Sequence, residues 1–382
     1  MELDERIEGY LQSRKENHLY RQLTHPDQLI DFSSNDYLGL ARSAFIRQQV
    51  ENELNSRMLH KSGATGSRLL NGNSALYTDL EEMLAEIHHA AAALVFNSGF
   101  DANVGLLSTV AQKQDIVFYD ELVHASIHQG MKLSRAVMVS FRHNDMADLE
   151  EKLQSYTGFE VRFIVSESVF SMEGDRAKLK ELASLAEQYK AKLIIDEAHA
   201  TGLFGINGSG LCNETGIEKS CFARVYTFGK AMGSHGAVVV GSELLKNYLI
   251  NFSRNFIYST ALETSNLLRV KHSYFFIQSN KNQLFKLNKL IKYFNYKLSM
   301  LNNSMEVCGD GPIFGVLIGD NLKCRETAAY LQKNGFDVRA ILSPTVPKTT
   351  ERIRIILHSF NTEGQIDRII NYLVDYQNID KR

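Results

Sequence analysis

Residues 191–200 read AKLIIDEAHA, an apolar run that ends in two acidic residues and a histidine. A continuous apolar run without polar alternation indicates a strand buried on both faces, as in a parallel sheet covered by helices. Similar runs recur through the central chain, with helical periods such as Leu179–Tyr189 between them. The candidate strands are Ala92–Phe96, Ile116–Tyr119, Ala136–Phe141, Arg162–Ser166, Lys192–Asp196, Arg224–Phe228 and Ala237–Val240. This alternation predicts an α/β fold with a mostly parallel central sheet.

The composition is that of an ordinary globular protein. The chain has 382 residues, of which 44% are hydrophobic and 23% charged, and its formal net charge is −2. The near-neutral charge argues against a nucleic-acid binder that uses a basic patch, and no stretch approaches the roughly 18–20 apolar residues of a membrane span. Four cysteines without CxxC spacing favour reduced thiols in a cytoplasmic protein over a disulfide scaffold or a zinc site.

The last third of the chain has a different pattern. Residues 271–303 are rich in Lys and Asn, and their apolar residues recur at helical spacing, so we predict one long, partly exposed helix there. Strands are expected at Ile313–Ile318, Val338–Ala340 and Ile353–Leu357. We therefore expect three parts: an N-terminal arm (1–40), a large domain (41–270) and a smaller C-terminal α+β domain (271–382).

Polar residues directly after the predicted strands carry the functional information, because ligands of open parallel sheets bind at the carboxyl ends of the strands. These segments supply one lysine, one aspartate on a buried strand, two histidines and a glycine-containing turn before a helix. They are Asn97–Phe100, Asp120–His124, Glu167–Ser171, Asp196–His199 and Thr227–Lys230.

Three of these segments have both a chemical and a structural interpretation. A buried Asp196 needs a partner, such as a protonated ring nitrogen, although it could instead begin a helix. Lys230, between Gly229 and Gly233, could form a Schiff base or lie on the surface. Ser98 and Gly99 precede a helical pattern, whose N-terminus could bind a phosphate or simply be capped.

Two other patterns are not expected to form sites. His124 and His128 have the i, i+4 spacing of metal ligands, but no accompanying Glu gives an HExxH motif, so we expect no metal. GINGSG (205–210) has the wrong glycine order for a dinucleotide-binding loop, and we expect a turn.

Motifs along nearly the whole chain resemble the α-oxoamine synthase family of fold-type I pyridoxal-phosphate (PLP) enzymes, whose fold is aspartate aminotransferase-like. The matching stretches are FSSNDYLGLA (32–41), SGATGSRLLNGNSALYTDLEE (62–82), FNSGFDANVGLL (96–107), DELVHASIHQG (120–130), FRHND (141–145), ESVFSMEGD (167–175), IIDEAHATGLFG (194–205), TFGKAMGSHGA (227–237) and FIYSTAL (256–262).

The resemblance implies a role for each matched residue. Lys230 resembles the lysine that binds the cofactor as a Schiff base, His124 the histidine that stacks on its ring, Asp196 the partner of the ring nitrogen and His199 the partner of the phenolic oxygen. Further cofactor contacts are implied for Ser98, Gly99, Phe100, Ser171 and Thr227, and, across the interface of a homodimer, for Ser259 and Thr260. Substrate contacts are implied for Arg21, Asn35, His124, Thr345 and Arg354.

The reaction that the resemblance implies joins an amino acid to an acyl thioester, of CoA or of an acyl carrier protein, with loss of CO₂. L-Alanine with a pimeloyl thioester, the biotin-pathway pair, fits the motifs NDYLGL and SPTVP (343–347). Glycine with an acetyl group and serine with a palmitoyl group stay open, because Leu342 stands where an arginine often precedes PTVP in the enzymes that use pimeloyl groups. An aminotransferase would not need the SGATGSR and PTVP segments, and a catalytically inactive relative would not keep Lys230 with His124 and Asp196.

Overall fold

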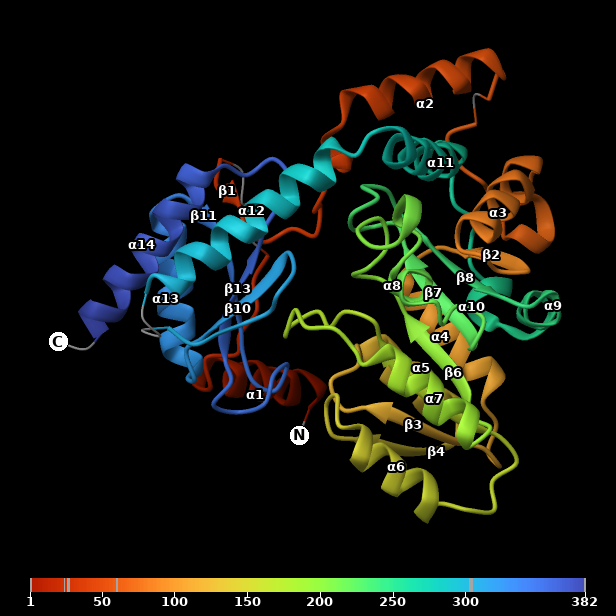
Figure 1. Ribbon diagram of the computed structural model, residues 1–382, viewed down its shortest axis with the longest axis horizontal. Helices are drawn as coiled ribbons and strands as arrows, with labels where there is room; N and C mark the ends of the chain where they lie inside the picture. The colour runs from red at the N-terminus through yellow and green to blue at the C-terminus, as the bar shows by residue number, and fades with distance from the viewer. Residues whose placement is uncertain (1, 24, 26–27, 60, 302–304, 381–382) are drawn as a thin grey trace. The chain divides into compact units, whose positions relative to one another are not determined.

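The computed structural model describes residues 2–23, 25, 28–59, 61–301 and 305–380 (Figure 1). Contacts between residues group the chain into two units. The larger unit comprises Leu38–Ser171 and Arg176–Leu284, and the smaller comprises Met1–Tyr37, Met172–Asp175 and Phe285–Arg382. The division into an arm (1–40), a large domain (41–270) and a C-terminal domain (271–382) stays a prediction about folding units.

The strand that ends at Asp196, β6 (Lys192–Asp196), is the middle strand of a seven-stranded sheet in the larger unit. The strand order is β2-β8-β7-β6-β5-β3-β4, and only the pairings of β8 are antiparallel within this sheet. The other strands are β2 (Ala92–Phe96), β3 (Ile116–Asp120), β4 (Val137–Phe141), β5 (Arg162–Glu167), β7 (Cys221–Thr227) and β8 (Ala237–Gly241). The predicted α/β fold with a mostly parallel sheet is confirmed.

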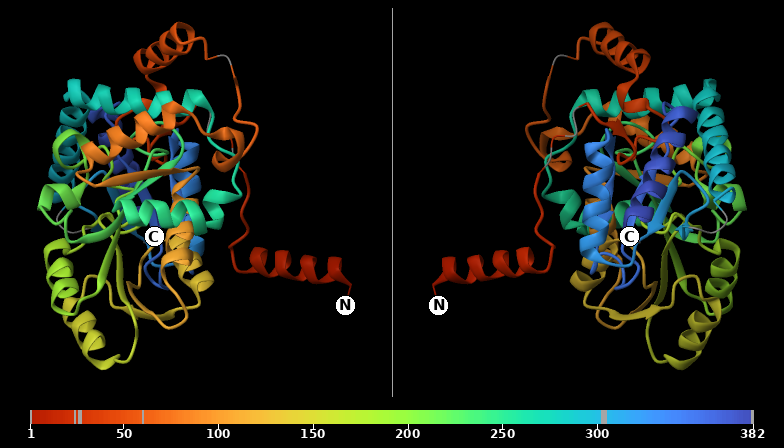
Figure 2. Two further views of the ribbon diagram at one scale, coloured as in Figure 1. Left: turned by 90° about the vertical axis from the view of Figure 1, so that its right-hand side faces the viewer. Right: turned by 90° about the vertical axis from the view of Figure 1, so that its left-hand side faces the viewer.

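Helices cover both faces of this sheet (Figure 2). The helices of this unit are α2 (Ala44–Ser56), α3 (Ala75–Ile87), α4 (Gly99–Val110), α5 (Ala125–Ser134), α6 (Met146–Ser155), α7 (Leu179–Gln188), α8 (Leu211–Thr215), α9 (Glu243–Phe252), α10 (Arg254–Ile257) and α11 (Thr264–Ser279), with short helical turns at Leu40–Arg42, Arg68–Gly72 and Ile206–Gly208. The last of these turns confirms that GINGSG forms a turn. Of the helices, α2 packs on α11 and not on the sheet. Apolar side chains of α4, α5, α9 and α10 pack with those of the strands in one buried core.

Short polar side chains fix where several of these helices begin. The hydroxyl or carboxylate of Ser98, Asp145 and Ser242 accepts a hydrogen bond from a backbone N–H in the first turn of α4, α6 and α9, respectively. Such caps satisfy N–H groups that have no partner inside the helix. The cap at Ser98 thus sets the start of the helix that points at the candidate site.

The smaller unit contains two sheets. β1 (Ile30–Asp31) pairs with β11 (Phe336–Asp337) in parallel, and an antiparallel sheet has the order β12-β13-β10-β9. Its remaining elements are α1 (Leu3–Glu16), β9 (Val307–Cys308), β10 (Ile313–Leu317), α13 (Asn321–Lys333), β12 (Arg339–Ile341), β13 (Arg352–Ile356) and α14 (Glu363–Asp380). This mixture of helices and antiparallel strands agrees with the predicted α+β character.

The single helix predicted over 271–303 is wrong. The segment forms the end of α11 and all of α12 (Asn282–Ser299), and the chain is extended between them at Asn280 (φ −136°, ψ 104°). The Asn280 side chain accepts the backbone N–H of Asn282 at 3.0 Å, a local bond that competes with helix continuation. Residues 302 and 303 lie outside the described residues. Within the described part of the chain, no helix has the length and apolarity needed to cross a membrane.

Candidate active site

The polar segments predicted to lie at one edge of the sheet are found at the carboxyl ends of β2, β3, β5, β6 and β7 in the structure. Glu167, the last residue of β5, is the register partner of Asp196, the last residue of β6. Asp196 is in turn paired with Val225 on β7, two residues before that strand ends. Because these strands run in the same direction, their carboxyl ends converge on one site.

Asp196 is buried, with a relative exposure of 5%. Its Oδ2 accepts a hydrogen bond from Nδ2 of Asn103 at 2.6 Å, and its Oδ1 accepts the backbone N–H of Ala198 at 2.8 Å. No helix begins after Asp196, because the chain enters a series of turns. The alternative role as a helix cap is therefore excluded, and the carboxylate is held as an acceptor inside the fold.

His124 is the N-cap residue of α5. Its backbone N–H donates to Oε1 of Glu167 at 2.6 Å, and its Nδ1 lies 2.8 Å from Oγ of Ser126. Desolvation lowers the pKa of His124; the nearby carboxylate of Asp196 opposes this shift and Lys230 adds to it. The imidazole, the carboxylate and the ammonium are therefore close enough to influence one another.

Lys230 lies in the tight turn between β7 and β8 and is partly buried. Its carbonyl accepts the backbone N–H of Gly233 at 2.9 Å. Gly233 has φ +60°, and a Cβ there would collide with the backbone of Ala41, so glycine is required. The turn thereby fixes the direction in which the lysine leaves the strand.

Ser98, Gly99 and Phe100 form the start of α4. Ser98 Oγ accepts the backbone N–H of Asp101 at 3.0 Å, which confirms the capping role. A Cβ on Gly99 would lie 2.6 Å from Cγ2 of Thr227, so this helix start and the end of β7 are in contact. Phe100 is half exposed. Gly99, the first residue of α4, therefore lies beside Thr227, and a helix N-terminus is a suitable place for a phosphate.

His199 and Ser171 lie after β6 and β5, as predicted. His199 is buried, three residues past Asp196 in the turns that follow β6, and Ser171 is partly buried. Their roles toward the cofactor stay predictions.

Ser259 and Thr260 are held against their own chain. Thr260 accepts a hydrogen bond from Nδ2 of Asn97 at 2.5 Å through its carbonyl and forms a β-bridge with Ser67. The backbone N–H of Ala261 donates to the Gly66 carbonyl at 3.0 Å. The SGATGSR segment thus positions Thr260 and Ala261. The contact of Ser259 and Thr260 with a second subunit stays a prediction.

Arg354 and Asn35 lie together in the smaller unit. Nη2 of Arg354 donates to Oδ1 of Asn35 at 3.0 Å, and the Tyr37 hydroxyl donates to the same oxygen at 3.2 Å. Burial lowers the pKa of Arg354 and raises the pKa of Tyr37, while the arginine charge opposes the shift of Tyr37. A desolvated guanidinium among neutral groups favours a carboxylate ligand.

The other two predicted substrate residues lie at the surface of the same unit. Thr345 is exposed and its backbone N–H donates to the Leu342 carbonyl at 2.9 Å. Arg21 is exposed in the segment after α1. Neither side chain has a geometry that specifies its ligand.

The sequence profile of the aminotransferase class I and II family matches residues 27–373. The chain belongs to this family. A related 8-amino-7-oxononanoate synthase from Emericella nidulans is 39% identical, over 97% of this chain and 95% of that protein.

Two solved structures have the same fold. Serine palmitoyltransferase from S. paucimobilis with a bound PLP–myriocin aldimine has a TM-score of 0.90 and 25% identity, over 99% of each chain. 8-Amino-7-oxononanoate synthase from Francisella tularensis has a TM-score of 0.80 and 29% identity, over 93% of this chain and 100% of that chain. The protein is thus an α-oxoamine synthase, a PLP-dependent acyltransferase of fold type I.

The residues present fit the cofactor of this family. The site combines a buried carboxylate (Asp196), an imidazole (His124) and an amine (Lys230), with a helix N-terminus at which Gly99 leaves room that a Cβ would fill. A carboxylate suits a protonated ring nitrogen, an amine suits an aldehyde and a helix N-terminus suits a phosphate.

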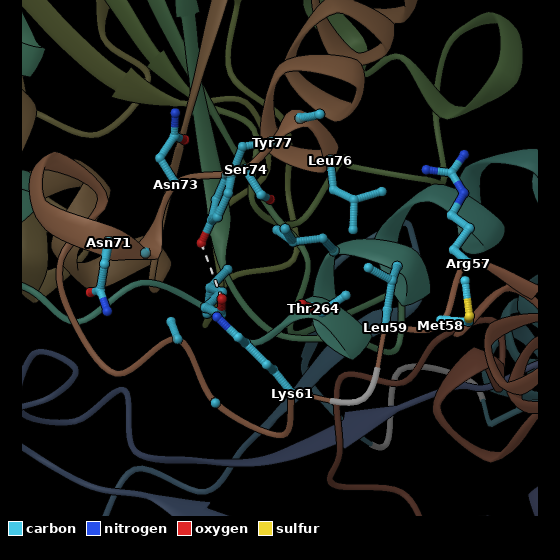
Figure 3. Close-up of a pocket in the computed structure, with 16 residues that line it drawn as sticks. Arg57, Met58, Leu59, Lys61, Asn71, Asn73, Ser74, Leu76, Tyr77 and Thr264 are labelled. Atoms are coloured by element: carbon cyan, nitrogen blue, oxygen red, sulfur yellow. Dashed lines mark hydrogen bonds between the residues drawn. The ribbon is translucent and has the colours of Figure 1, made fainter. Parts of the chain in front are cut away.

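A cavity of 420 Å³ opens beside the SGATGSR segment of this α-oxoamine synthase (Figure 3). Leu76, Leu262 and Leu267 give it apolar walls, and Arg57 and Lys61 lie at its margin. Arg57 is paired with Glu53 at 3.1 Å, while Lys61 is exposed on its loop. The cavity shares Leu262 with the segment that carries Ser259 and Thr260.

Three supporting residues received no role from the sequence. Asn103 and Glu167 are buried polar residues that bond Asp196 and His124, respectively, and Ser126 bonds the His124 ring. The sequence does mark Asn103, because it is the one side-chain amide in the largely apolar helix GFDANVGLLSTV. Its partner, however, is 93 positions away in the chain.

Proposed function

We propose that this enzyme condenses L-alanine with a pimeloyl thioester, releasing the thiol and CO₂, to give 8-amino-7-oxononanoate for biotin biosynthesis. The relative of that name, 39% identical over 97% of the chain, carries this proposal. The grouping of Lys230, His124 and Asp196 at one edge of the sheet supports the chemistry that the reaction needs.

Bound PLP supplies an electron sink for the pair of electrons left when the amino acid loses a proton or CO₂. Asp196 would accept a hydrogen bond from the protonated ring nitrogen of the cofactor, because a buried carboxylate is stabilised by a charged partner. Ser98, Gly99 and Thr227 would hold the phosphate. His124 would cover the ring, and His199 would contact the phenolic oxygen.

Lys230 moves the proton in this proposal. Its Nζ takes the proton from Cα of the amino acid and later returns a proton to the product carbon. Arg354 binds the carboxylate of the amino acid with a planar pair of N–H groups, and Asn35 and Tyr37 hold the guanidinium from behind.

We place part of the acyl donor in the cavity of Figure 3. Its apolar walls suit an acyl or pantetheine chain, and Lys61 suits a phosphate or an acidic carrier protein. We also propose a homodimer in which Ser259 and Thr260 reach the partner's cofactor phosphate, and a cytoplasmic location, which the scarcity of cysteine supports.

A second reaction, of L-serine with palmitoyl-CoA, is favoured by two observations. Serine palmitoyltransferase matches this fold at a TM-score of 0.90 over 99% of the chain, and Leu342 adds no cation for the distal carboxylate of a pimeloyl group.

Thiol release by the cofactor-loaded enzyme distinguishes these reactions. L-Alanine, glycine and L-serine are each tested with pimeloyl-, acetyl- and palmitoyl-CoA. We expect release with alanine and pimeloyl-CoA. Release only with serine and palmitoyl-CoA, or only with glycine and acetyl-CoA, would contradict the proposed substrates but keep the family chemistry.

A further inference from the structure

Two helices and one strand contribute residues to one chain of hydrogen bonds at the candidate site. Asn103 on α4 uses both hydrogens of its amide: Nδ2 donates to Oδ2 of Asp196 at 2.6 Å and to Oγ of Ser126 at 3.0 Å. Ser126, the second residue of α5, lies 2.8 Å from Nδ1 of His124 through its hydroxyl. Asn103 and Ser126 are 3% and 1% exposed, so these hydrogen bonds lie inside the fold.

The protonation of His124 follows from these donors. The backbone N–H of Ser126 points at Nδ1 of His124 at 3.2 Å and can only donate, so Nδ1 must be an acceptor. The hydroxyl oxygen of Ser126 already accepts a hydrogen bond from Asn103. The hydroxyl proton of Ser126 is therefore available to donate to the same Nδ1 of His124. The imidazole is then neutral, with its proton on Nε2.

The packing of α5 on α4 keeps this geometry in place. A Cβ added to Gly130 of α5 would lie only 2.9 Å from the Asn103 carbonyl oxygen and 2.9 Å from Cβ of Leu107, both on α4. The absence of a side chain therefore lets the two helices approach closely enough for Asn103 to reach Ser126.

We propose that Asn103 and Ser126 form a relay that keeps His124 neutral, so that the negative charge of Asp196 is reserved for the ring nitrogen of the bound cofactor. Without the relay, a protonated His124 would compete for Asp196, which lies close enough to interact with it. Asn103 and Ser126 are thus positioning residues, and the inference rests on the proposed roles of His124 and Asp196.

The other charged groups near His124 come from four elements. Asp196 ends β6, Lys230 follows β7, His128 lies on α5, and Glu167 ends β5 and binds the His124 backbone. Asp196 favours the protonated imidazole, whereas Lys230 disfavours it. The relay adds two donors to Nδ1, which favour the neutral form.

Titration of the His124 ring tests the relay. The full-length protein is labelled with [13Cε1]histidine, and its NMR signals are followed against pH with the cofactor bound and after its removal. The signal that disappears in His124→Gln is assigned to the His124 ring. We expect its midpoint to rise by about half a pH unit to one unit in Ser126→Ala and in Asn103→Ala, the equivalent of one hydrogen bond. Ser126→Thr, which keeps the hydroxyl, should titrate as the wild type does.

A matched control and a second readout make the test decisive. Ser134→Ala removes another buried hydroxyl of α5, which bonds the Met131 carbonyl at 2.6 Å, and should leave the midpoint unchanged. The dissociation constant of PLP should rise about threefold to tenfold in Asn103→Ala. An unchanged midpoint in Ser126→Ala, or an equal shift in Ser134→Ala, would overturn the relay. Neither readout needs a substrate, so a wrong choice of amino acid or thioester would not affect them.

Discussion

Glu167 at the end of β5 accepts the backbone N–H of His124 at 2.6 Å, although the two residues are 43 positions apart in the chain. Glu167 is 2% exposed, and the N–H that its carboxylate binds belongs to the N-cap residue of α5. The bond therefore joins the sheet edge to the helix that carries the candidate stacking ring.

Removal of that acceptor should destabilise the fold and weaken cofactor binding. In Glu167→Ala the buried N–H of His124 loses its acceptor, at a cost of about 1–3 kcal/mol. Urea unfolding and the dissociation constant of PLP measure the two effects. Glu167→Gln keeps an acceptor oxygen and should restore most of the loss, whereas Glu187→Ala, an exposed acid on α7, should change neither value. Wild-type PLP binding by Glu167→Ala would rule out this role.

Replacement of Lys230 should abolish covalent attachment of the cofactor. Lys230→Ala should bind PLP without a borohydride-reducible link and should lose about 10²–10⁴-fold in kcat, the contribution of a positioned acid–base group. Mass spectrometry after reduction reads out the link, and the exposed Lys113→Ala serves as the control. If the Lys230→Ala protein still carried covalently bound cofactor after reduction, another lysine would be the one that holds it.

Arg354 should bind the carboxylate of the amino acid through the geometry of its guanidinium as well as through its charge. Arg354→Lys keeps a cation but loses the planar pair of donors, so the KM for the amino acid should rise about 10- to 100-fold with a smaller change in kcat. Arg339→Lys serves as the matched control, because Arg339 on β12 is the register partner of Arg354 on β13. Equal effects of both substitutions on KM would contradict a specific carboxylate clamp.

Lys61 should affect the acyl donor and not the amino acid. Lys61→Ala removes an exposed cation from the margin of the cavity in Figure 3, and the KM for an acyl-CoA should rise about two- to fivefold at low salt. The difference should shrink at high salt because mobile ions screen exposed charges. A rise in the KM for the amino acid instead would place the donor elsewhere; Lys113→Ala is the control.

His88 should make stability fall in acid. It is fully buried, stacks on Tyr226, and its ring nitrogens lie 3.0 Å from the Ser209 carbonyl and 2.9 Å from the Tyr274 hydroxyl. Burial lowers the pKa of His88 from 6.5 to about 3, so the unfolded chain binds the proton first. The stabilisation is complete above pH 6.5 and is lost as the pH falls toward 3, which amounts to about 2 kcal/mol between pH 7 and pH 5.

Urea unfolding at both pH values measures this loss. His88→Gln should reduce the difference in unfolding free energy between pH 7 and pH 5, whereas the exposed neighbour in His89→Gln should leave it unchanged. An unaltered pH dependence in His88→Gln would assign the acid sensitivity to other groups.

Much of the larger unit could be predicted from local patterns. Apolar runs such as Lys192–Asp196 located the strands to within a few residues, because a strand buried on both faces has no polar alternation. The break at Asn280 was missed, because the periodicity of apolar residues continues on both sides of it and only a side-chain bond to Asn282 separates the helices.

The sequence by itself predicted the mostly parallel sheet and the polar segments at its edge that contain Lys230, Asp196 and His124, because each segment follows an apolar run at the edge where parallel strands place ligands. Only the tertiary structure decided how those groups are held. Asn103 reaches Asp196 across 93 positions, and Glu167 reaches His124 across 43. Such bonds leave no periodic signal, since they depend on which helices and strands the folded chain brings into contact.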